Sequence, residues 1–248
     1  MFESYKDIFN QRGTAYHQGM LKYPLARTEE FQQIIQLAEI ANGHVILDIP
    51  SGGCYISNFI DPEAKIISVE TSKEFIKDAK PPENNTILVC DDIADIPLLS
   101  DSADRIISLA GLHHVSNKPS FYREAYRLLK TEGLFCIADA FQDSKVARFL
   151  DIFVDQNNSM GHEGEFLNSQ TNTELEAANF QVLYSSSISY FWRFNSLDAM
   201  AEYCQLLFGI DRADQATIIT GIENYLGYQI HQDKCYMNWE LHFIKCLK

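Results

Sequence analysis

The stretch HVILDIPSGGCYISNFIDPEAKIISVETS, residues 44–72, decides how the chain folds. Its segments 44–49 and 65–70 are short apolar runs rich in β-branched residues, which is the pattern of buried strands. Between them lies a turn that contains Gly52 and Gly53, followed by a segment too short and proline-broken for a long helix. The stretch therefore predicts two strands of a buried sheet, joined through a glycine-containing turn.

Further apolar runs extend this pattern along the chain. Three more short strands are expected at 86–90, 105–110 and 133–140, and helical patterns separate them. Continuous apolar strands that alternate with helices are typical of a parallel sheet covered on both faces. Two longer strands are expected at 180–194 and 236–248. The sequence thus predicts an α/β fold with a doubly wound, mostly parallel, seven-stranded sheet.

The same pattern divides the chain into four segments. Residues 1–42 mix aromatic residues and glycines with an apolar helical stripe, and are expected to form an N-terminal helical lid. Residues 43–192 form the predicted core, and 235–248 its final strand. Two helical patterns separated by Gly209 predict a helical cap at 193–234, inserted between the last two strands.

The composition limits the classes of partner. The chain has 248 residues, with 34 acidic against 20 basic side chains and a formal net charge of −14. Such a field repels a phosphate backbone, so no nucleic-acid partner is expected. No apolar run is long enough to span a membrane, and the first residues do not resemble a secretory signal. We expect a cytoplasmic protein without a membrane partner.

The cysteines indicate a reducing environment and no metal. None forms a CxxC pair, and their spacing is not that of metal ligands. They are Cys54, Cys90, Cys136, Cys204, Cys235 and Cys246. Free buried thiols are the expected state, and no bound metal is expected.

Acidic side chains stand at the ends of three successive predicted strands: Asp48, Glu70 and Asp92. In an open parallel sheet, ligands bind outside the carboxyl ends of the strands. Glu70 can accept both hydroxyls of an adenosine ribose, and Asp92, with the N–H of Ile93, can meet an adenine ring. The glycine pair and Glu70 each have a plainer explanation: a glycine pair is usually just a turn, and Glu70 could cap the next helix.

Four quoted segments carry a family resemblance. VILDIPSGG (45–53), IISVE (66–70), CDDIADIPLLSDSADRIISLAGLHHV (90–115) and FYREAYRLLKTEGLFCIAD (121–139) resemble the class I S-adenosylmethionine-dependent methyltransferases, in their ubiquinone-biosynthesis-like small-molecule branch. The resemblance is close over residues 44–140 and loose over the last two strands. It implies a Rossmann-like methyltransferase fold, with S-adenosylmethionine as cofactor and S-adenosylhomocysteine as its product.

The turn departs from the family's motif at two positions. That motif usually runs acid, apolar, Gly, any, Gly, any, Gly; Asp48 and Gly52 match it, whereas Pro50 and Cys54 replace its first and last glycines. Cys54 could narrow the pocket or point aside. A pyrophosphate needs the full glycine-rich approach to a helix N-terminus, so the phosphate-free methyl donor fits better than a nicotinamide dinucleotide.

The resemblance implies a role for each strand end. Glu70 is expected to hold the ribose, Asp92 and Ile93 the adenine, and Asp48 with Gly52 the methionine end of the donor. The full set of expected cofactor-binding residues is Tyr16, Arg27, Asp48, Pro50, Ser51, Gly52, Glu70, Thr71, Asp92, Ile93 and Leu109.

Five residues near this edge have open roles. Tyr16 could close over the donor, and Arg27 could meet its carboxylate, although a surface arginine before a helix is equally consistent with the sequence. His113 and His114 follow the fourth strand, and His162 lies in a glycine-rich loop with Glu163 and Glu165 beside it, so each is a candidate general base. Packing or loop ordering is the alternative explanation for all three histidines.

The expected function is methyl transfer to a small molecule, most simply O-methylation in a biosynthetic pathway. N-methylation or C-methylation, or a catalytically silent module that binds the donor or its product, are the alternatives. Aromatic residues in the cap favour an acceptor that is partly apolar or aromatic, and the acidic composition disfavours a strongly anionic one. The C-terminal strand pair could also serve a homodimer.

Overall fold

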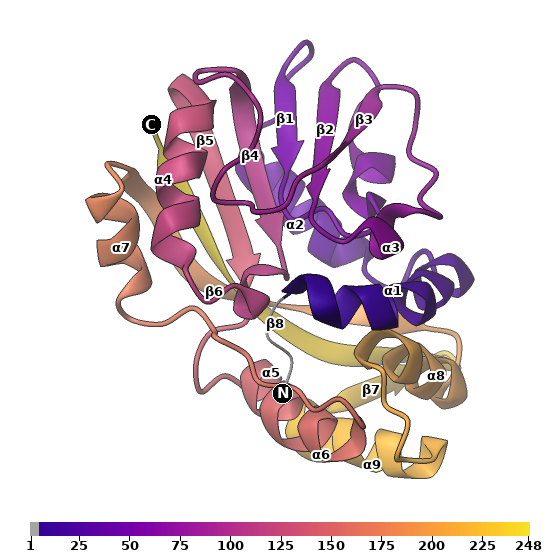
Figure 1. Ribbon diagram of the computed structural model, residues 1–248. Coiled ribbons are helices and arrows are strands. Elements are labelled where there is room, and N and C mark those ends of the chain that lie inside the picture. The colour runs from indigo at the N-terminus through magenta and orange to yellow at the C-terminus, as the bar shows by residue number, and fades with distance from the viewer. Residues whose placement is uncertain (1–4) are drawn as a thin grey trace.

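The computed structural model describes residues 5–248 as one eight-stranded sheet with helices on both faces (Figure 1). Residues 1–4, the start of the predicted lid, lie outside the described residues. The strands are β1 (Val45–Asp48), β2 (Lys65–Glu70), β3 (Asn85–Val89), β4 (Ala103–Leu109), β5 (Leu129–Asp139), β6 (Gln181–Phe194), β7 (Tyr228–His231) and β8 (Lys234–Leu247). Their order is β3-β2-β1-β4-β5-β8-β6, with β7 paired to β8 off this path.

Strands β1 to β5 pair in parallel, whereas β8 runs antiparallel to β5, β6 and β7. The parallel strands are the short apolar runs of the sequence, buried on both faces as such runs require. The predicted α/β, doubly wound and mostly parallel class is therefore confirmed.

The sheet has one strand more than the seven that we predicted. β7 forms a hairpin with β8, inside the segment expected to be entirely helical. Gln232 and Asp233 join them with positive φ values of 50° and 59°, as a two-residue hairpin turn of the primed type requires. The four residues of β7 are exposed or half-buried, so no apolar alternation marks this strand in the sequence.

Nine α-helices surround the described part of the sheet, together with short 3-10 and π-helical turns. The helices are α1 (Tyr5–Lys22), α2 (Thr28–Ala38), α3 (Lys73–Ile76), α4 (Lys118–Leu128), α5 (Lys145–Arg148), α6 (Asp155–Asn157), α7 (Thr171–Ala177), α8 (Leu197–Phe208) and α9 (Gln215–Tyr225). The 3-10 turns are η1 (Tyr55–Phe59) and η2 (Leu112–His114), and the π-helical turn is η3 (Phe149–Val154).

The lead-in to the sheet is one long helix. α1 continues for 18 residues through Gly13 and Gly19, although glycine lowers helix propensity. A side chain at Gly13 would come within 2.9 Å of the Phe75 backbone, and one at Gly19 within 3.2 Å of Leu206. These glycines therefore let α1 approach α3 and α8 closely.

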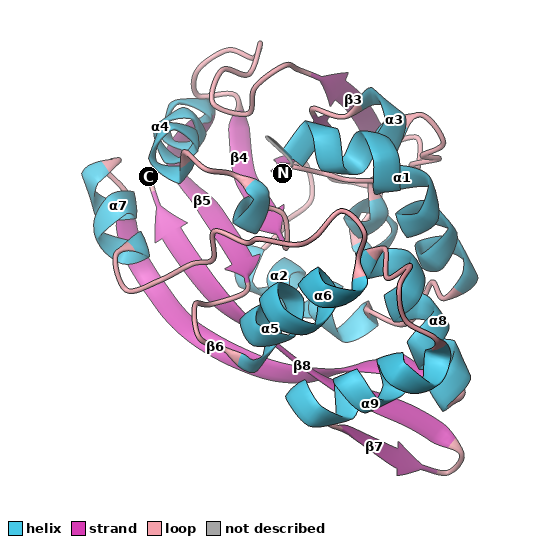
Figure 2. Ribbon diagram, turned by 60° about the horizontal axis from the view of Figure 1, so that its bottom comes forward, coloured by secondary structure: helices cyan, strands magenta, loops and turns pink. Residues whose placement is uncertain are grey.

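Two hydrophobic clusters fill the two faces of the sheet. The larger one joins α2, the sheet and the cap helices, and includes Ile34 and Phe149. The other lies under α4 and α7, and includes Phe121 and Leu175. β6 and β8, of 14 residues each, extend past the shorter strands and curve beneath α5 and α6 (Figure 2). The lid helix α1, the helices α5 and α6, and the extended parts of β6 and β8 thus lie around the carboxyl edge of the parallel strands.

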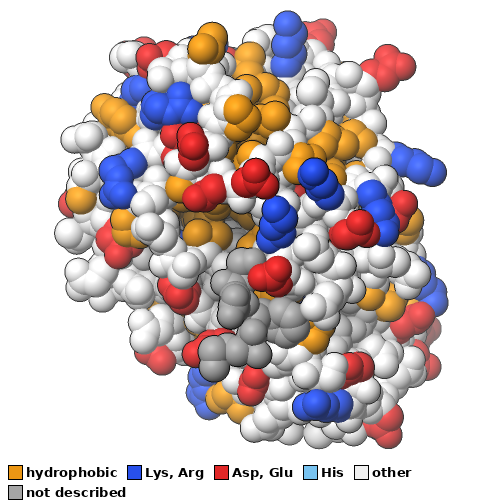
Figure 3. All heavy atoms as spheres, in the orientation of Figure 1, with side chains coloured by type: hydrophobic (Ala, Val, Ile, Leu, Met, Phe, Trp, Pro, Cys, Tyr) orange, Lys and Arg blue, Asp and Glu red, His pale blue; other side chains and the backbone are white. Residues whose placement is uncertain are grey.

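The surface of the described residues carries mixed charge. On the face shown in Figure 3, basic side chains are interspersed with acidic ones and form no continuous basic patch among the described residues. Within residues 5–248, no helix combines the length and the apolar character needed to cross a membrane.

Candidate active site

The turn after β1 lies where the strand order reverses, between β1 and β4. The Ser51 N–H donates to the Val69 carbonyl at 2.9 Å, which fixes the turn to β2. Gly52 has a φ of +56°, a left-handed conformation that glycine adopts without strain. Its N–H donates to Glu70 Oε2 at 2.8 Å. The backbone of the turn is therefore held directly against the acid at the end of β2.

Glu70 is fully buried, and hydrogen bonds reach both of its oxygens. Oε1 accepts the N–H groups of Thr71 and Ser72 at 2.8 and 2.9 Å, and Oε2 also accepts the Tyr5 hydroxyl at 2.9 Å. Burial raises the pKa of Glu70 in spite of these bonds. Ser72, not Glu70, caps α3, because its hydroxyl accepts the N–H of Phe75.

The lid helix places aromatic rings over this turn. Phe9 stacks on Phe75 with ring centroids 4.4 Å apart, and Tyr5 packs against Phe9 at 4.6 Å. Between lid and turn remains a small cavity of about 50 Å³. Tyr16, Arg27, Asp48, Pro50, Ser51, Gly52 and Leu109 are among the residues that line it.

A larger pocket of about 520 Å³ opens on the other side of Tyr5. Tyr5 and Pro50 line both the pocket and the small cavity, so Tyr5 forms part of the wall between them. The predicted residues that line the pocket are Pro50, Thr71, Asp92, Ile93, His113 and His114. Asp92 is exposed there, and its Oδ1 accepts the N–H of Ala94 at 2.8 Å.

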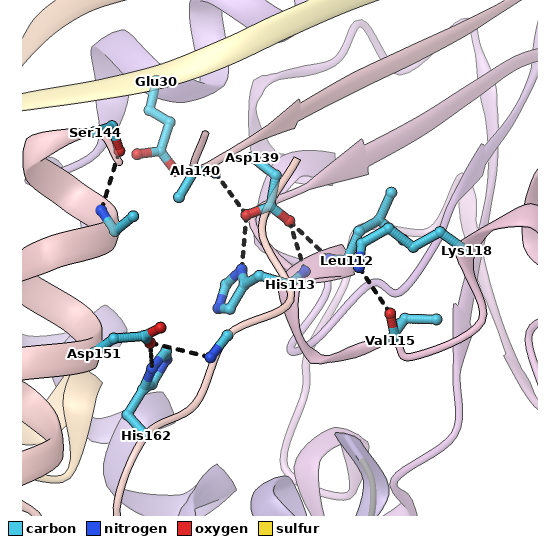
Figure 4. A network of polar contacts seen from close by, with 12 residues as sticks. Glu30, Leu112, His113, Val115, Lys118, Asp139, Ala140, Ser144, Asp151 and His162 are labelled. Atoms are coloured by element: carbon cyan, nitrogen blue, oxygen red, sulfur yellow. Dashed lines mark hydrogen bonds and ion pairs between the residues drawn. The ribbon is translucent and has the colours of Figure 1, made fainter. Parts of the chain in front are cut away.

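Three histidines line a further cavity of about 60 Å³, beneath the lid and beside the cap. His113 lies in η2, and its Nδ1 is 2.7 Å from Oδ1 of Asp139 at the end of β5 (Figure 4). His162 lies in the loop after α6, and its Nδ1 is 2.8 Å from Oδ1 of Asp151 in η3 (Figure 4). The Nδ1 of His114 is buried without a hydrogen-bond partner among the described residues.

The surroundings of His114 and His162 favour neutral imidazoles. Burial, together with the neighbouring His113 and His162, lowers the pKa of His114 well below its ordinary value. Burial also lowers the pKa of His162, although Asp151 opposes it. Burial alone would raise the pKa of Asp139, but His113 and backbone N–H groups outweigh it and hold that pKa below its usual range.

Arg27 is a buried residue, so its interpretation as a surface arginine is wrong. Its side chain is 5% exposed and pairs with Glu30, which has no exposed surface. It also donates to the Tyr16 hydroxyl. The other oxygen of Glu30 accepts from the Tyr190 hydroxyl at 3.1 Å and the Trp192 indole at 2.8 Å. This network joins α2 to β6 on the wall of the histidine cavity.

A second buried arginine lines the same cavity. Arg12 donates from a terminal guanidinium nitrogen to the Leu207 carbonyl at 3.1 Å. Its Nε is buried and has no hydrogen-bond partner in the part of the chain that the structure describes. Burial lowers the pKa of Arg12 to about 10, so the group remains a cation at neutral pH.

Comparison with known protein families shows which kind of domain contains this site. Residues 47–137 match the family model described as a methyltransferase domain. The chain carries a class I S-adenosylmethionine-dependent methyltransferase domain. The match spans the turn after β1, the end of β2 and η2, so it includes most of the residues that line the open pocket.

Solved structures share the fold of this methyltransferase over most of its length. The YcgJ protein of Bacillus subtilis is 20% identical, with 89% of this chain and 98% of that chain covered and a TM-score of 0.63. Phosphoethanolamine N-methyltransferase 2 of Haemonchus contortus, in complex with phosphomonomethylethanolamine and S-adenosylhomocysteine, is 14% identical, with 100% and 60% covered and a TM-score of 0.62. The [4+2]-cyclase SpnF is 16% identical, with 89% and 80% covered and a TM-score of 0.60.

The residues of the methyltransferase fit its donor only if both Tyr5 and the lid helix α1 move. Glu70 is a buried acceptor at the end of β2, and the open pocket beside Asp92 has the volume for a nucleoside base. The Tyr5 hydroxyl, however, already donates to Oε2 of Glu70, and Glu70 is not among the described residues that line this pocket. The small cavity near Asp48 likewise needs the lid to shift before a methionine moiety fits.

Cys54 does not narrow the donor site. It is 1% exposed and is absent from the described lining of both cavities beside the turn. Its φ of +62° is left-handed, which explains why glycine suits this position of the motif. Burial raises the pKa of its thiol to about 11.

Several residues of the site were not predicted from the sequence. They are Tyr5, Arg12, Glu30, Asp139 and Asp151. Asp139 stands at a strand end, so the same argument that selected Asp48, Glu70 and Asp92 could have found it. The others approach the site from helices, and only the packing of the lid and cap brings them there.

Proposed function

We propose that the protein transfers a methyl group from S-adenosylmethionine to a hydroxyl oxygen of a small, partly apolar acceptor. The observation that carries this proposal is the enclosed cavity beside the donor turn. Histidines, two buried arginines and the rings of Trp192 and Trp239 line it. This cavity, of about 60 Å³, combines these polar groups with apolar rings, and it must widen before a small acceptor fits.

In this proposal the donor lies along the carboxyl edge of β1, β2 and β3. Asp92 and Ile93 meet the adenine, Glu70 with Thr71 the ribose, and the turn from Asp48 to Gly52 the methionine end. Tyr16 and Leu109 close the small cavity over that end. Arg27 acts through Tyr16, because its own guanidinium is already paired with Glu30. When bound, the donor supplies an electrophilic methyl carbon on a sulfonium.

The chain's own residues position the acceptor and move its proton. The unpartnered Nε of Arg12 can donate to an oxygen of the acceptor. A neutral histidine of the cluster can accept the hydroxyl proton. The acceptor oxygen then forms its bond to the methyl carbon as the carbon–sulfur bond breaks, and that electron pair stays on sulfur. Alignment of these atoms supplies most of the acceleration.

The proposed segments keep their boundaries with one adjustment. Residues up to 42 form the lid, 43–192 the core, 193–234 the cap and 235–248 the final strand. The adjustment concerns the cap, which contains the strand β7 and begins after β6 ends at Phe194.

An acceptor screen tests the hydroxyl proposal. The purified chain is incubated with radiolabelled donor and matched sets of small aromatic alcohols, amines and activated-carbon compounds, and label transfer is measured. We expect transfer to alcohols. Transfer confined to amines or carbon acids would overturn O-methylation. His113→Gln serves as the site variant and His231→Gln, on the exposed strand β7, as the control. Only His113→Gln should lose methyl transfer.

A further inference from the structure

The three histidines of the cavity come from two distant segments and meet at the spacing of a metal site. Each of His113, His114 and His162 offers a ring nitrogen, and these nitrogens lie within 4.8 Å of one another. Their ring centroids are 4.1, 5.7 and 5.4 Å apart. With metal–nitrogen bonds of about 2.0–2.1 Å in tetrahedral geometry, imidazole centroids lie roughly 5 Å apart. Small side-chain rotations therefore suffice to close the cluster around an ion.

Carboxylates fix the orientation of two of these rings. Asp139 holds Nδ1 of His113 at 2.7 Å, and Asp151 holds Nδ1 of His162 at 2.8 Å (Figure 4). Because an ionised carboxylate can only accept a hydrogen bond, both Nδ1 atoms carry the proton, and the neutral ring presents Nε2 as a lone pair. Histidines that bind metals in proteins are commonly oriented in this way, because the ring nitrogen that does not bind the metal donates a hydrogen bond to a carboxylate.

Both carboxylates are themselves fixed by the backbone. Oδ2 of Asp139 accepts the N–H groups of Leu112 and His113 at 2.8 and 3.1 Å. Oδ1 of Asp151 also accepts the N–H of Gly164 at 3.0 Å. Asp151 lies in the π-helical turn η3, a distortion of the kind that often occurs at functional sites. The rings therefore stand on rigid supports.

The third histidine adds a nitrogen without a partner. The Nδ1 of His114 is buried, and no described residue forms a hydrogen bond with it. An unpaired buried polar atom costs about 1–3 kcal/mol. A cation at the centre of the cluster gives all three histidines a partner at once.

We propose that His113, His114 and His162 bind a divalent transition-metal ion, with zinc as the first candidate. Imidazole ligands suit zinc, copper, iron and nickel, whereas magnesium and calcium prefer oxygen ligands. Three protein ligands leave a fourth position open, as in catalytic zinc sites. All three histidines line the cavity that also holds Arg12, Trp192 and Trp239, so the open position lies where an acceptor enters.

Metal binding does not depend on the proposed function, but its consequence for methyl transfer rests on that function. An acceptor hydroxyl in the open position would release its proton to solvent water more readily, because the ion stabilises the resulting oxyanion. The histidine lone pairs then hold the ion, so no histidine of the cluster accepts that proton. The acceptor class is then an alcohol or phenol small enough for the cavity. The proposed ligands are histidines from two distant segments, whereas the expectation of no metal rested on the spacing of the cysteines.

The test is metal titration of the full chain without donor. After removal of metal with a chelator, Zn²⁺ is titrated by calorimetry, and Co²⁺ is followed by visible absorption. We expect one ion per chain and a cobalt spectrum typical of tetrahedral nitrogen and oxygen ligands, without thiolate charge transfer. Asp151→Asn should weaken Zn²⁺ binding by about 10–100-fold, the usual effect of losing a carboxylate behind a ligand.

The variant His162→Asn distinguishes the loss of a metal ligand from the loss of Asp151, the carboxylate that orients it. The asparagine N–H can still donate to Asp151, while the Nε2 ligand is lost, so we expect binding to fall further than in Asp151→Asn. His114→Gln breaks no hydrogen bond of the described structure and provides a second ligand variant if the first fails to fold. His231→Asn, on the exposed strand β7, is the matched control and should bind as the wild type does.

Two results would overturn the site: no stoichiometric Zn²⁺ binding by the wild type, or equal affinity in a folded ligand variant. Equal affinity in a folded ligand variant would assign the ion to other groups. Absence of Zn²⁺ binding by the wild type would leave the histidines as proton carriers only. Titration of the same preparations with S-adenosylmethionine separates the two proposals. Donor binding without metal binding overturns only the metal site, whereas metal binding without donor binding overturns only the proposed function.

Discussion

Glu70 is the single residue on which the donor site depends most. Its two oxygens hold the turn after β1, the start of α3 and the lid helix through Tyr5. Hydrogen bonds to a charged group contribute about 1.5–3 kcal/mol. Glu70→Gln should therefore weaken donor binding by about 10–100-fold, measured by calorimetry with S-adenosylhomocysteine.

The exposed Glu74, paired with Lys77 on α3, provides the matched control for this prediction. Glu74→Gln should leave donor affinity unchanged. Equal affinity of wild type and Glu70→Gln would contradict the assignment of Glu70 to the ribose. Thermal unfolding of both variants separates a local effect on the site from a loss of fold.

Glu30 is the residue on which the stability of the cavity wall depends. It has no exposed surface and accepts from Arg27, Tyr190 and Trp192. Removing one partner of a buried ion pair leaves an uncompensated charge, at a cost of about 3–5 kcal/mol. Glu30→Ala should lower the free energy of unfolding by that amount in urea titrations. A loss below about 1 kcal/mol, the scale of an exposed pair, would contradict the buried network.

At the scale of elements, α1 decides whether the donor can enter. In the proposed donor site, Tyr5 on α1 competes with the ribose for Oε2 of Glu70, and Phe9 and Phe75 stack beside it. Tyr5→Phe removes the competing hydroxyl but keeps the ring. We expect it to tighten donor binding by about tenfold, because one hydrogen bond to a carboxylate no longer has to be broken.

Association kinetics with S-adenosylhomocysteine check this role of the lid. Tyr184→Phe, on the half-exposed part of β6, is the control and should not change the rate. Weaker binding in Tyr5→Phe would show that the hydroxyl contacts the bound donor instead of competing with it.

The elements differ in how well the sequence predicts them. Buried parallel strands are continuous apolar runs, so the bounds of β1 to β5 can be predicted to within a few residues. The candidate site residues at the ends of these strands lie along one edge of the sheet. α1 carries no strong apolar stripe, because its glycines serve close packing. η3 and β7 lack a distinctive periodicity altogether. The strand ends that carry the proposed donor residues were thus predictable, whereas the positions of Tyr5, Arg12 and Asp151 depend on tertiary packing.

At the scale of the whole molecule, the free buried thiols make the free energy of unfolding depend on pH above about pH 9. Burial raises the pKa of Cys54 and Cys90 to about 11 and that of Cys136 to about 12, from 9.0 for an ordinary thiol. Below pH 9 both folded and unfolded chains keep these protons. As the pH rises from 9 toward 11, the unfolded chain ionises first, so the folded state loses stability.

Urea unfolding at a series of pH values tests this dependence. Between about pH 8 and pH 10.5, each such thiol should lower the free energy of unfolding by about 1–2 kcal/mol, since one pKa unit corresponds to about 1.4 kcal/mol. A free energy of unfolding that stays constant over this range would contradict the burial of the thiols.

The central claim, that the edge beside Glu70 binds S-adenosylmethionine, is tested most directly by calorimetric titration. The wild type is titrated with S-adenosylmethionine and S-adenosylhomocysteine, with NADH as the control ligand. The account predicts saturable binding of one equivalent of the first two and none of NADH. Absence of binding by both sulfur ligands, or binding of NADH with equal affinity, would contradict it.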